Sequence, residues 1–553
     1  LYPEGDLAAH LIGYTGTGNI GRAGLEFSLN EKMKGTPHKI LTKYTIKGRS
    51  RKPLADVDYT KIITRGADVV LTIDSYMQFV VERELAKVRK QFKAIYANAV
   101  VLHPKSGEIL AMANSPSFDP NHYSDYAGEL RKNRLLVDVY EPGSVIKPFT
   151  VIAALDQRVV TPEMKFYCEK GRFYFHGRTI RDDIHRFEDL SVHDILVRSS
   201  NIGTVKIAQR LAPNDWRRQS ALLYDYLRRF GFKHRGEKTL PVLPGETGGI
   251  LRHPREWMPA SIGAVPYGQE IATNSVTLAA AYAAIANRGV YQPPQIIKGY
   301  KTEDRLFYPR QPRDSYRIVR RDVVEEVVEM MVDVTEDPEG TGTNVRIPGY
   351  SVAGKTGTAQ IPDPVHGGYK RGSRIASFAG FFPARDPQAV IIVMVEEPQN
   401  GKYGGEVAGP AWKAIAEELV AYWGISPTVP DDPLFVKAQE EHGRSKVEQM
   451  KAEMDRERTF GVTKMLRVPE DRDPNADLTT MPNLIGLPIR QAYIALAKRG
   501  LTATFAGSGK IASQPIPAGT PIEQKGHIGK VECTAMLTDP NVADPSNTLV
   551  TLN

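Results

Sequence analysis

The segments of this chain that can form β-strands lie far apart in the sequence. Two apolar runs, residues 99–102 and 109–112, are joined by a turn-forming Pro-Lys-Ser-Gly segment. The next clear runs are residues 350–358, 375–382 and 389–396, and the sequence between the two groups is mainly helical. Strands at both ends of a region with helices between them predict an α+β domain, in which distant segments assemble one antiparallel sheet.

Three helices can be recognised from their ends and their periodicity. The first begins at Asp74 or Ser75, either of which can cap it. The second, residues 275–288, consists of small residues and is followed by Gly289. The third begins at Pro410 and ends before Gly424. Its apolar face is expected to bury four residues, Trp412, Ile415, Leu419 and Trp423.

The chain of 553 residues is too long for one compact core, so two to four domains are expected. Residues 1 to about 68 are rich in Gly and Lys and lack sustained periodicity, which predicts an extended, partly β module. Residues 426–480 are charged and poor in aromatic residues, as is typical of a linker. After Met481 a small αβ pattern follows, with a predicted helix at residues 489–499.

The composition excludes several classes of protein. No basic motif with interleaved aromatic residues favours nucleic-acid binding. Cys168 and Cys533 form neither a disulfide framework nor a CxxC metal site, and HExxH is absent, so we expect no metal or cofactor. The longest apolar stretches, residues 278–286 and 389–395, are shorter than the ~18 residues of a membrane span. The chain begins at Leu1 without an initiator Met, and we interpret it as a mature or truncated fragment.

The first candidate motif is Ser-Val-Ile-Lys at residues 144–147, directly after Pro-Gly. The Pro-Gly pair breaks the chain just before a helix, which places Ser144 in the first turn. Because residues three apart share a helix face, the Lys147 ammonium group can approach the Ser144 hydroxyl. A desolvated lysine near the positive end of the helix dipole can lose its proton and act as a base. By itself, the pair is more typical of a helix surface.

The second motif is Ser-Ser-Asn at residues 199–201, within the helical region. From a turn between two helices, Ser199 could relay a proton while Asn201 orients the lysine and a substrate amide. The alternative is a cap for the helix that follows.

The third motif is Lys-Thr-Gly-Thr at residues 355–358, on a predicted strand. An extended backbone with Gly357 allows a peptide to pair alongside as an added strand. Lys355, Thr356 and Thr358 can hold a carboxylate by charge and hydrogen bonds. The alternative is an ordinary glycine-containing strand end. A phosphate-binding loop is disfavoured because GxxxxGK[ST] is absent.

Together the three motifs resemble the active site of the penicillin-binding protein and serine β-lactamase superfamily in their order, separation and structural context. The resemblance implies that Ser144 is the nucleophile and Lys147 its general base. Ser199 and Asn201 would form the second catalytic element.

The same resemblance assigns the third motif to substrate binding. Lys355, Thr356, Gly357 and Thr358 would bind the terminal carboxylate of a donor peptide. The backbone N–H groups of Ser144 and Thr358 would form the oxyanion hole.

The resemblance covers nearly the whole chain. Residues 1–94 resemble the N-terminal pedestal of class B, monofunctional penicillin-binding proteins, truncated at its start, and residues 95–425 resemble the transpeptidase domain. Residues 426–480 would be the linker and residues 481–553 a single PASTA module. One departure is Glu270, which follows Tyr-Gly-Gln at a position where family members often have a small residue or glycine.

The resemblance implies a division- or sporulation-type D,D-transpeptidase that cross-links peptidoglycan stem peptides and is a target of β-lactam antibiotics. Implied partners are a polytopic glycan polymerase and other division proteins. An anchor upstream of residue 1 would hold the enzyme in the inner membrane, with the catalytic domain on the extracytoplasmic, periplasmic side.

Two other functions remain open at this stage. A D,D-carboxypeptidase would pass the acyl group to water, and a wall-binding receptor would use the same scaffold without catalysis. A class A β-lactamase is disfavoured because its middle motif is Ser-Asp-Asn and it needs a second carboxylate to activate water. The nearest candidate here is Glu246, for which we predict a structural role.

Overall fold

The computed structural model divides the chain into two compact units, Leu1–Met450 and Lys451–Asn553, and each is described by itself. The structure describes residues 1–35, 42–44, 51–53, 66–182, 186–302, 307–309, 314–363, 365–436, 480–485, 496, 501–506, 510–513, 517–521 and 526–534. The predicted helix at residues 489–499 lies outside these residues except for Leu496, and so does most of the predicted linker.

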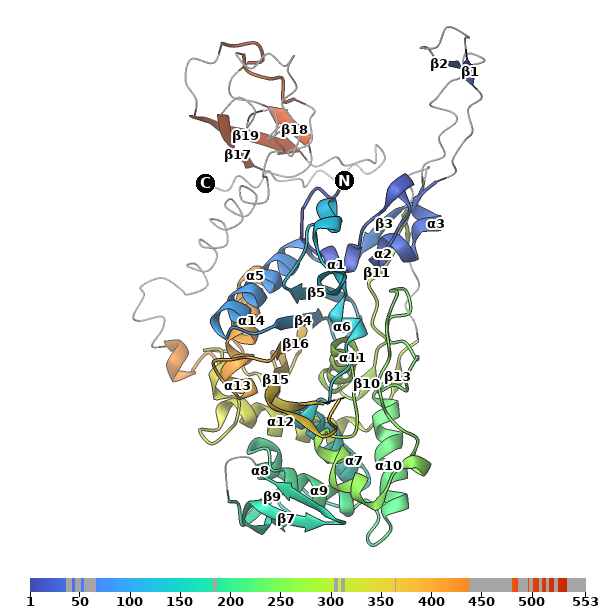
Figure 1. Cartoon of the computed structure of the whole chain (residues 1–553). Helices are drawn as coiled ribbons and strands as arrows, with labels where there is room; N and C mark the ends of the chain where they lie inside the picture. The colour runs from blue at the N-terminus through green and yellow to red at the C-terminus, as the bar shows by residue number, and fades with distance from the viewer. Residues whose placement is uncertain are drawn as a thin grey trace. The chain divides into compact units, whose positions relative to one another are not determined.

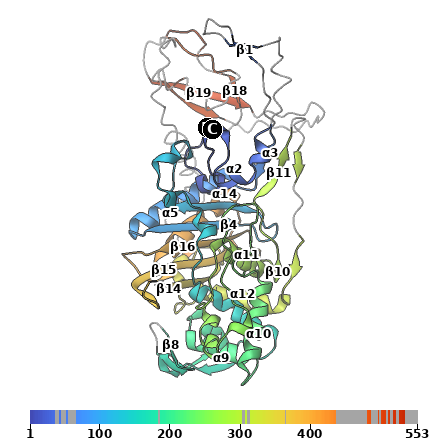
Figure 2. The same cartoon turned by 45° about the vertical axis from the view of Figure 1, so that its right-hand side comes forward.

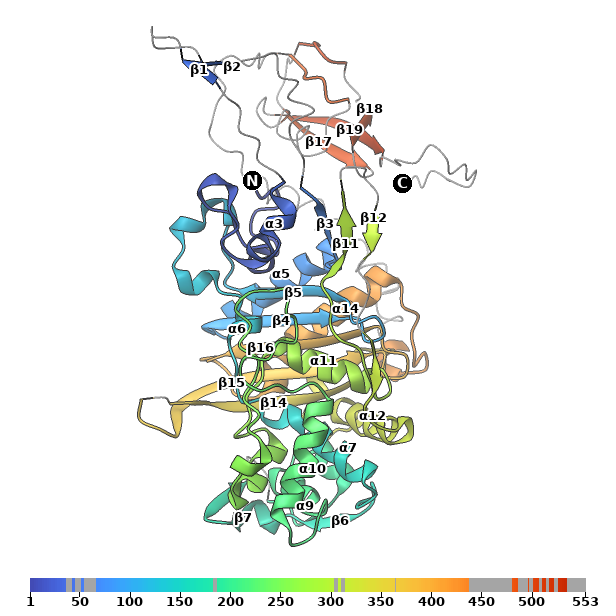
Figure 3. The same ribbon diagram turned by 90° about the vertical axis from the view of Figure 1, so that its right-hand side faces the viewer.

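The centre of the first unit is a five-stranded antiparallel sheet with strand order β14-β15-β16-β4-β5 (Figure 3). Its strands are β4 (Tyr96–Leu102), β5 (Ile109–Ser115), β14 (Ala353–Pro362), β15 (Tyr369–Phe382) and β16 (Ala389–Glu396). The early hairpin joins the late strands through β4 and β16, where Ala99 pairs with Val393. The prediction of an α+β domain with a sheet built from distant segments is therefore confirmed.

Both faces of the sheet are buried because side chains of β16 alternate between two cores. Ile391, Val393 and Val395 belong to one core, and Val390 and Ile392 belong to the other. The first core contains helices α5 (Ser75–Gln91) and α14 (Gly409–Trp423), and the second contains α11 (Ser275–Ala286) (Figure 1). A continuous Val/Ile run is the expected sequence for a strand that is covered on both sides.

The predicted helices are present, with small differences at their ends. Asp74 caps α5 by accepting a hydrogen bond from the backbone of Met77. Helix α11 ends at Ala286, two residues earlier than expected. In α14, Trp412 is fully buried and donates to the backbone of Ile391, whereas Trp423 is only half-buried, contrary to the prediction. Trp423 is the last residue of the helix, where less of the core covers the side chain.

The region between the two groups of strands forms a helical layer beside the sheet. Its main helices are α7 (Lys147–Asp156), α8 (Val192–Val197), α9 (Asn201–Gln209), α10 (Trp216–Arg229) and α12 (Arg321–Glu336). Strand β8 lies beside α9 in this region (Figure 2). The shorter elements of this region are α6 (Arg134–Val137), β6 (Lys165–Tyr167), β7 (Arg172–Phe175), β8 (Arg178–Arg181), β9 (Asp189–Ser191), β10 (Val290–Tyr291) and β13 (Tyr316–Arg317). Helix α13 (Gly404–Val407) follows β16.

The N-terminal region differs from the prediction of an extended module. Its first 35 residues form three short helices, α1 (Ala9–Ile12), α2 (Gly24–Ser28) and α3 (Asn30–Met33). Helices of about one turn leave no periodic pattern for sequence analysis to detect. Strands occur further along, as the hairpin of β1 (Thr42–Tyr44) and β2 (Arg51–Pro53) and as a sheet of β3 (Asp68–Leu71), β11 (Ile297–Lys301) and β12 (Phe307–Pro309).

The second unit contains a three-stranded sheet with the order β17-β19-β18. Strands β17 (Leu501–Ala506) and β19 (Gly526–Thr534) are parallel, and β18 (Lys510–Ser513) is antiparallel to β19. Met481, Leu484, Leu496 and Leu501 are buried. Among the residues described in both units, every helix is too short or too polar to cross a lipid bilayer.

Candidate active site

Ser144 lies in a short 3₁₀ turn, Gly143–Ile146, which leads directly into α7 at Lys147. Pro148 occupies the first turn of α7, where no backbone N–H is needed for the helix. Ser144 is half-buried and lines a cleft, whereas Lys147 is fully buried behind it. The serine is therefore accessible to a substrate, and the lysine is shielded from water.

Ser199 meets Lys147 from the turn between α8 and α9. The Lys147 ammonium donates to the Ser199 hydroxyl at 3.0 Å and also to the Ser199 main-chain carbonyl. Ser199 has the left-handed backbone conformation, with φ of 62°. The structure thus brings the first two predicted motifs together. Asn201 lines the same cleft, and its side-chain amide donates to Arg181 O at 2.8 Å.

Asp182 holds this turn in place, a role that the sequence did not indicate. Its carboxylate accepts hydrogen bonds from the Ser200 hydroxyl at 2.8 Å and from the backbone N–H groups of Asn201 at 2.6 Å and Ile202 at 3.2 Å. It therefore satisfies free N–H groups at the start of α9 from a distant segment. Burial raises the pKa of Asp182, and the nearby charge of Lys147 opposes that shift.

Lys355 reaches the same place from β14, the edge strand of the sheet. Its side chain is fully buried, and the ammonium contacts the Thr356 carbonyl at 3.3 Å and hydroxyl at 3.4 Å. Burial lowers the pKa of Lys355 well below its ordinary value, and the positive charge of Lys147 lowers it further. A bound carboxylate would offset both effects, because an opposite charge favours the ammonium form.

Gly357 allows β14 to lie against the turn that carries Ser144. A Cβ atom at this position would stand 2.4 Å from the Ser377 hydroxyl and 2.9 Å from a methyl group of Val145. Any larger residue would therefore push β14 away from Ser144. The next residue, Thr358, uses its hydroxyl to accept a hydrogen bond from the backbone N–H of Gly404 at 3.2 Å.

A cleft of about 510 Å³ joins the three motifs. Ser144, Ser199, Asn201, Thr356 and Thr358 all line it. Lys147 and Lys355 are buried and Gly357 packs against Val145, so these three lie outside its lining. Residues that the sequence did not single out complete the wall, among them the Arg198–Glu339 ion pair and Tyr403. No local pattern could have indicated them, because each comes from a different loop.

Glu246 does not line the cleft. It is buried and accepts hydrogen bonds from the backbone N–H groups of Thr239 and Leu240, both at 2.8 Å. Its environment agrees with the predicted structural role. In the part of the chain that the structure describes, no group of three or more His, Cys, Asp or Glu side chains is placed to hold a metal ion.

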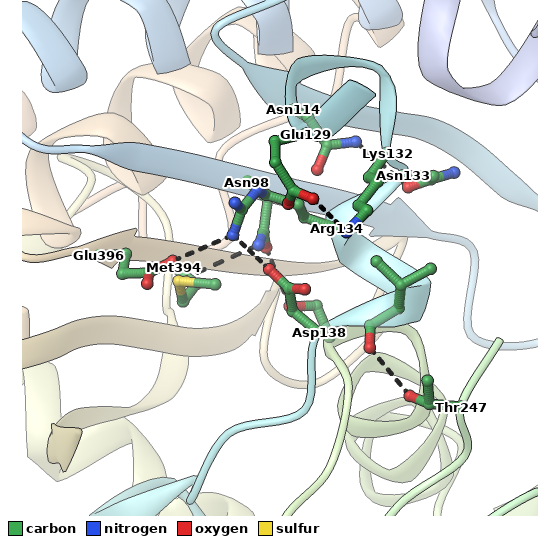
Figure 4. Close-up of polar contacts among 12 residues, drawn as sticks. Asn98, Asn114, Glu129, Lys132, Asn133, Arg134, Asp138, Thr247, Met394 and Glu396 are labelled. Carbon is green, nitrogen blue, oxygen red and sulfur yellow. Dashed lines mark hydrogen bonds and ion pairs between the residues drawn. The ribbon is translucent and has the colours of Figure 1, made fainter. Parts of the chain in front are cut away.

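The segment that leads into Ser144 is anchored on the sheet through Arg134 of α6 (Figure 4). The Arg134 guanidinium lies over the Tyr96 ring, 3.4 Å from its centroid, and contacts Asp138 at 2.5 Å and Glu396 at 3.7 Å. Stacking together with two carboxylates fixes a guanidinium in one orientation. The segment that leads to Ser144 is therefore tied to the ends of β4 and β16.

Comparison with known proteins agrees with this geometry. Residues 97–417 match the penicillin binding protein transpeptidase domain, and residues 479–528 match the PASTA domain, which confirms the predicted module. The chain is 35% identical to a probable peptidoglycan D,D-transpeptidase PenA from Neisseria meningitidis, over 79% of this chain and 71% of the relative. It is 33% identical to the peptidoglycan D,D-transpeptidase FtsI of Escherichia coli, over 77% and 68%.

A solved structure supports the same assignment. Penicillin binding protein 3 from Mycobacterium tuberculosis in its apo form superimposes with a TM-score of 0.68 at 31% identity, covering 78% of this chain and 92% of that one. The same protein complexed with aztreonam gives a TM-score of 0.67 at 30% identity, covering 78% and 91%. The present chain belongs to the penicillin-binding protein transpeptidase family.

Proposed function

We propose that this protein is a serine-type D,D-transpeptidase that cross-links peptidoglycan stem peptides through an acyl-enzyme on Ser144. The proposal rests on one observation: Ser144 lines the cleft three residues before a fully buried Lys147, whose ammonium donates to two oxygen atoms of Ser199. Ordinary surface pairs of Ser and Lys lack both the burial and the second contact.

The first half of the reaction forms the acyl-enzyme. The Ser144 oxygen attacks the carbonyl carbon of the penultimate D-alanine, and Lys147, in its neutral amine form, accepts the hydroxyl proton. The negative charge on the carbonyl oxygen is stabilised by the backbone N–H groups of Ser144 and Thr358. The C–N bond then breaks, and the terminal D-alanine leaves with the proton that Lys147 returns through Ser199.

The donor peptide is held by β14. As an edge strand, β14 offers unpaired backbone groups along which a peptide can lie as an added strand. Lys355, Thr356 and Thr358 bind the terminal carboxylate, and a β-lactam presents a carboxylate in the same place. The relative from M. tuberculosis has been solved with aztreonam and with ampicillin, which supports the proposal that this protein is a target of β-lactams.

The second half of the reaction transfers the acyl group to an amine of another stem peptide. Glu246, the candidate activator of water, lies outside the cleft, and its carboxylate accepts hydrogen bonds from backbone N–H groups. This favours an enzyme whose acyl-enzyme is hydrolysed slowly by water. The amine attacks the ester carbon and loses a proton, which passes through Lys147 to the Ser144 oxygen as the ester C–O bond breaks. A new peptide bond and a free Ser144 hydroxyl result. The names of the relatives support transfer over the carboxypeptidase alternative.

The remaining parts of the chain support the same setting. We assign residues 1–94 to a pedestal, 95–425 to the transpeptidase domain, 426–480 to a linker and 481–553 to a PASTA module. An anchor upstream of residue 1 would place the cleft on the extracytoplasmic side of the inner membrane. The pedestal would contact a polytopic glycan polymerase and division proteins.

Covalent labelling tests the nucleophile. Fluorescent penicillin should label the folded protein, and peptide mass mapping should place the adduct on Ser144. Ser144→Ala should abolish labelling, whereas Ser124→Ala, at an exposed serine outside the cleft, should label normally. Normal labelling of Ser144→Ala would refute this nucleophile, and an unlabelled wild-type protein would favour the receptor alternative.

A stem-peptide substrate, with and without an acceptor amine, tests the second half. A transpeptidase forms the cross-linked product when the amine is present. Release of D-alanine without any cross-linked product would show a carboxypeptidase instead.

A further inference from the structure

The carboxylate of Glu270 collects donors from three separate segments. One oxygen accepts from Arg178 at the start of β8, at 2.8 Å. The other accepts from Arg252 at 2.7 Å and from the Ser261 hydroxyl at 2.8 Å. Both guanidinium groups therefore contact the same carboxylate, and each of these hydrogen bonds is charge-assisted.

The backbone of Glu270 also has an unusual conformation. Its φ is 59°, in the left-handed region, which residues other than glycine adopt only at an energetic cost. A glycine would satisfy this backbone without strain, but it would remove the carboxylate that both Arg178 and Arg252 contact. The side-chain contacts are thus the physical reason for a glutamate at this position.

The same residue is bonded to the loop that carries the nucleophile. The backbone N–H of Glu270 donates to one oxygen of Glu141 at 2.9 Å, and the Tyr369 hydroxyl donates to the other, also at 2.9 Å. Two residues after Glu141, the N–H of Gly143 donates to the Gly268 carbonyl at 3.1 Å. Residues 268–270 therefore hold residues 141–143 at two points, immediately before Ser144.

We propose that Glu270 is a positioning residue for acylation, a role that rests on the proposed function of Ser144. Its ion pairs with Arg178 and Arg252 fix residues 268–270 on the helical layer. Through Glu141 and Gly143, this segment fixes the nucleophile turn relative to Thr358 on β14. Small displacements of a nucleophile from its attack geometry slow the chemical step more than they weaken binding.

The test compares the acylation kinetics of Glu270→Gln with those of the wild-type protein. Gln retains the size of the side chain but not its charge. We expect the first-order acylation rate constant to fall roughly tenfold, while the dissociation constant of the preceding complex changes by less than about twofold. Glu270→Gly, which keeps the backbone conformation without a side chain, should show the same loss of rate.

Ionic strength provides a second readout. The side chains of Arg178, Arg252 and Glu270 remain 31%, 38% and 26% exposed, so salt screens their interaction. The ratio of the wild-type acylation rate to the Glu270→Gln acylation rate should therefore approach one as the salt concentration increases. A ratio that does not change with salt would contradict an ionic origin.

Glu325→Gln is the matched control, because Glu325 of α12 also pairs with two arginines, Arg288 and Arg321, and lines a separate pocket. Its acylation rate should equal that of the wild type, whatever its thermal stability. Acylation of both Glu270 variants at wild-type rates would overturn the proposal, and so would an equal loss in Glu325→Gln. Failure of the wild-type protein to acylate at all would refute the proposed function instead.

Discussion

Lys147 and Ser199 are joined through two oxygen atoms of the same serine. The ammonium group donates to the Ser199 hydroxyl at 3.0 Å and to its main-chain carbonyl. The carbonyl contact depends only on the backbone, which the left-handed φ of 62° turns toward the lysine. The hydroxyl contact depends on the side chain. A mutation of Ser199 can therefore remove the hydroxyl that would transfer a proton and keep the carbonyl that positions the lysine.

Ser199→Ala removes the hydroxyl and keeps the carbonyl. Because a positioned proton-transfer group contributes about 10²-fold or more to a reaction, we expect acylation by a fluorescent penicillin to slow by about 10²-fold. Stopped-flow fluorescence measures this rate. Ser220→Ala is the control, since its buried hydroxyl donates to Trp216 O at 2.7 Å within α10, away from the cleft. Equal slowing in both variants would contradict a specific role for Ser199.

Asp182→Asn tests the distant cap of α9. Asn can accept from the backbone N–H groups of Asn201 and Ile202, but it no longer offers a charged oxygen to the Ser200 hydroxyl. We expect the free energy of unfolding to fall by about 2 kcal/mol, as measured by urea denaturation, with slower acylation.

Asp225→Asn is the matched control for Asp182, because it breaks an ion pair with Arg229 in which both side chains are 48% exposed. Such a surface pair contributes less than about 1 kcal/mol. Similar decreases in the free energy of unfolding of the two variants would show that Asp182 contributes no more to stability than an exposed carboxylate does.

The lowered pKa of Lys355 predicts that carboxylate binding weakens at alkaline pH. As pH rises through this pKa, the ammonium loses its charge and with it the attraction for an anion. The Ser144→Ala protein permits binding to be measured without acylation. The dissociation constant of benzylpenicillin should rise about tenfold on the alkaline side, which corresponds to the loss of one charge-assisted hydrogen bond.

The methyl ester of benzylpenicillin is the matched ligand for this experiment, because it has no carboxylate. The dissociation constant of the ester should not rise at alkaline pH. If both ligands weaken in parallel, the carboxylate is held elsewhere than at Lys355.

Gly404→Ala should disturb the contact of helix α13 with β14 and β15. A Cβ atom at this position would stand 2.2 Å from Ser377 O and 2.3 Å from Gly357 O, both backbone atoms of the sheet. Helix α13 must move away from β14 and β15, so we expect a loss of about 2 kcal/mol in unfolding free energy and slower acylation. At Gly128 the nearest atom is 4.0 Å away, and Gly128→Ala should leave both quantities unchanged. Wild-type stability of Gly404→Ala would show that this packing is looser than described.

Sequence analysis predicted best where burial imposes a pattern. Strand β16 was predicted at residues 389–396 and is found at Ala389–Glu396, because its continuous Val/Ile run is covered on both faces. Strand β14 was predicted at residues 350–358 but is found at Ala353–Pro362. Its end pairs with β15 in a polar hairpin, which leaves no apolar signature.

The residues of the site divide in a similar way. Ser144, Lys147, Ser199 and Lys355 could be proposed as site residues because they belong to short motifs with fixed spacing. Asp182 acts through pairing between distant segments, and no spacing within the chain indicates it.

The pairing of β4 with β16 has a consequence for biosynthesis. Strands β4 and β5 leave the ribosome early, yet the partner of β4 comes from the far end of the domain. Contacts between such distant segments form slowly, because a long intervening chain must first be ordered. A nascent chain that ends before β16 would expose the apolar surfaces of this hairpin and an unpaired strand edge, and should be retained by chaperones. We therefore expect the catalytic domain to become protease-resistant in one step, only after β16 has been synthesised.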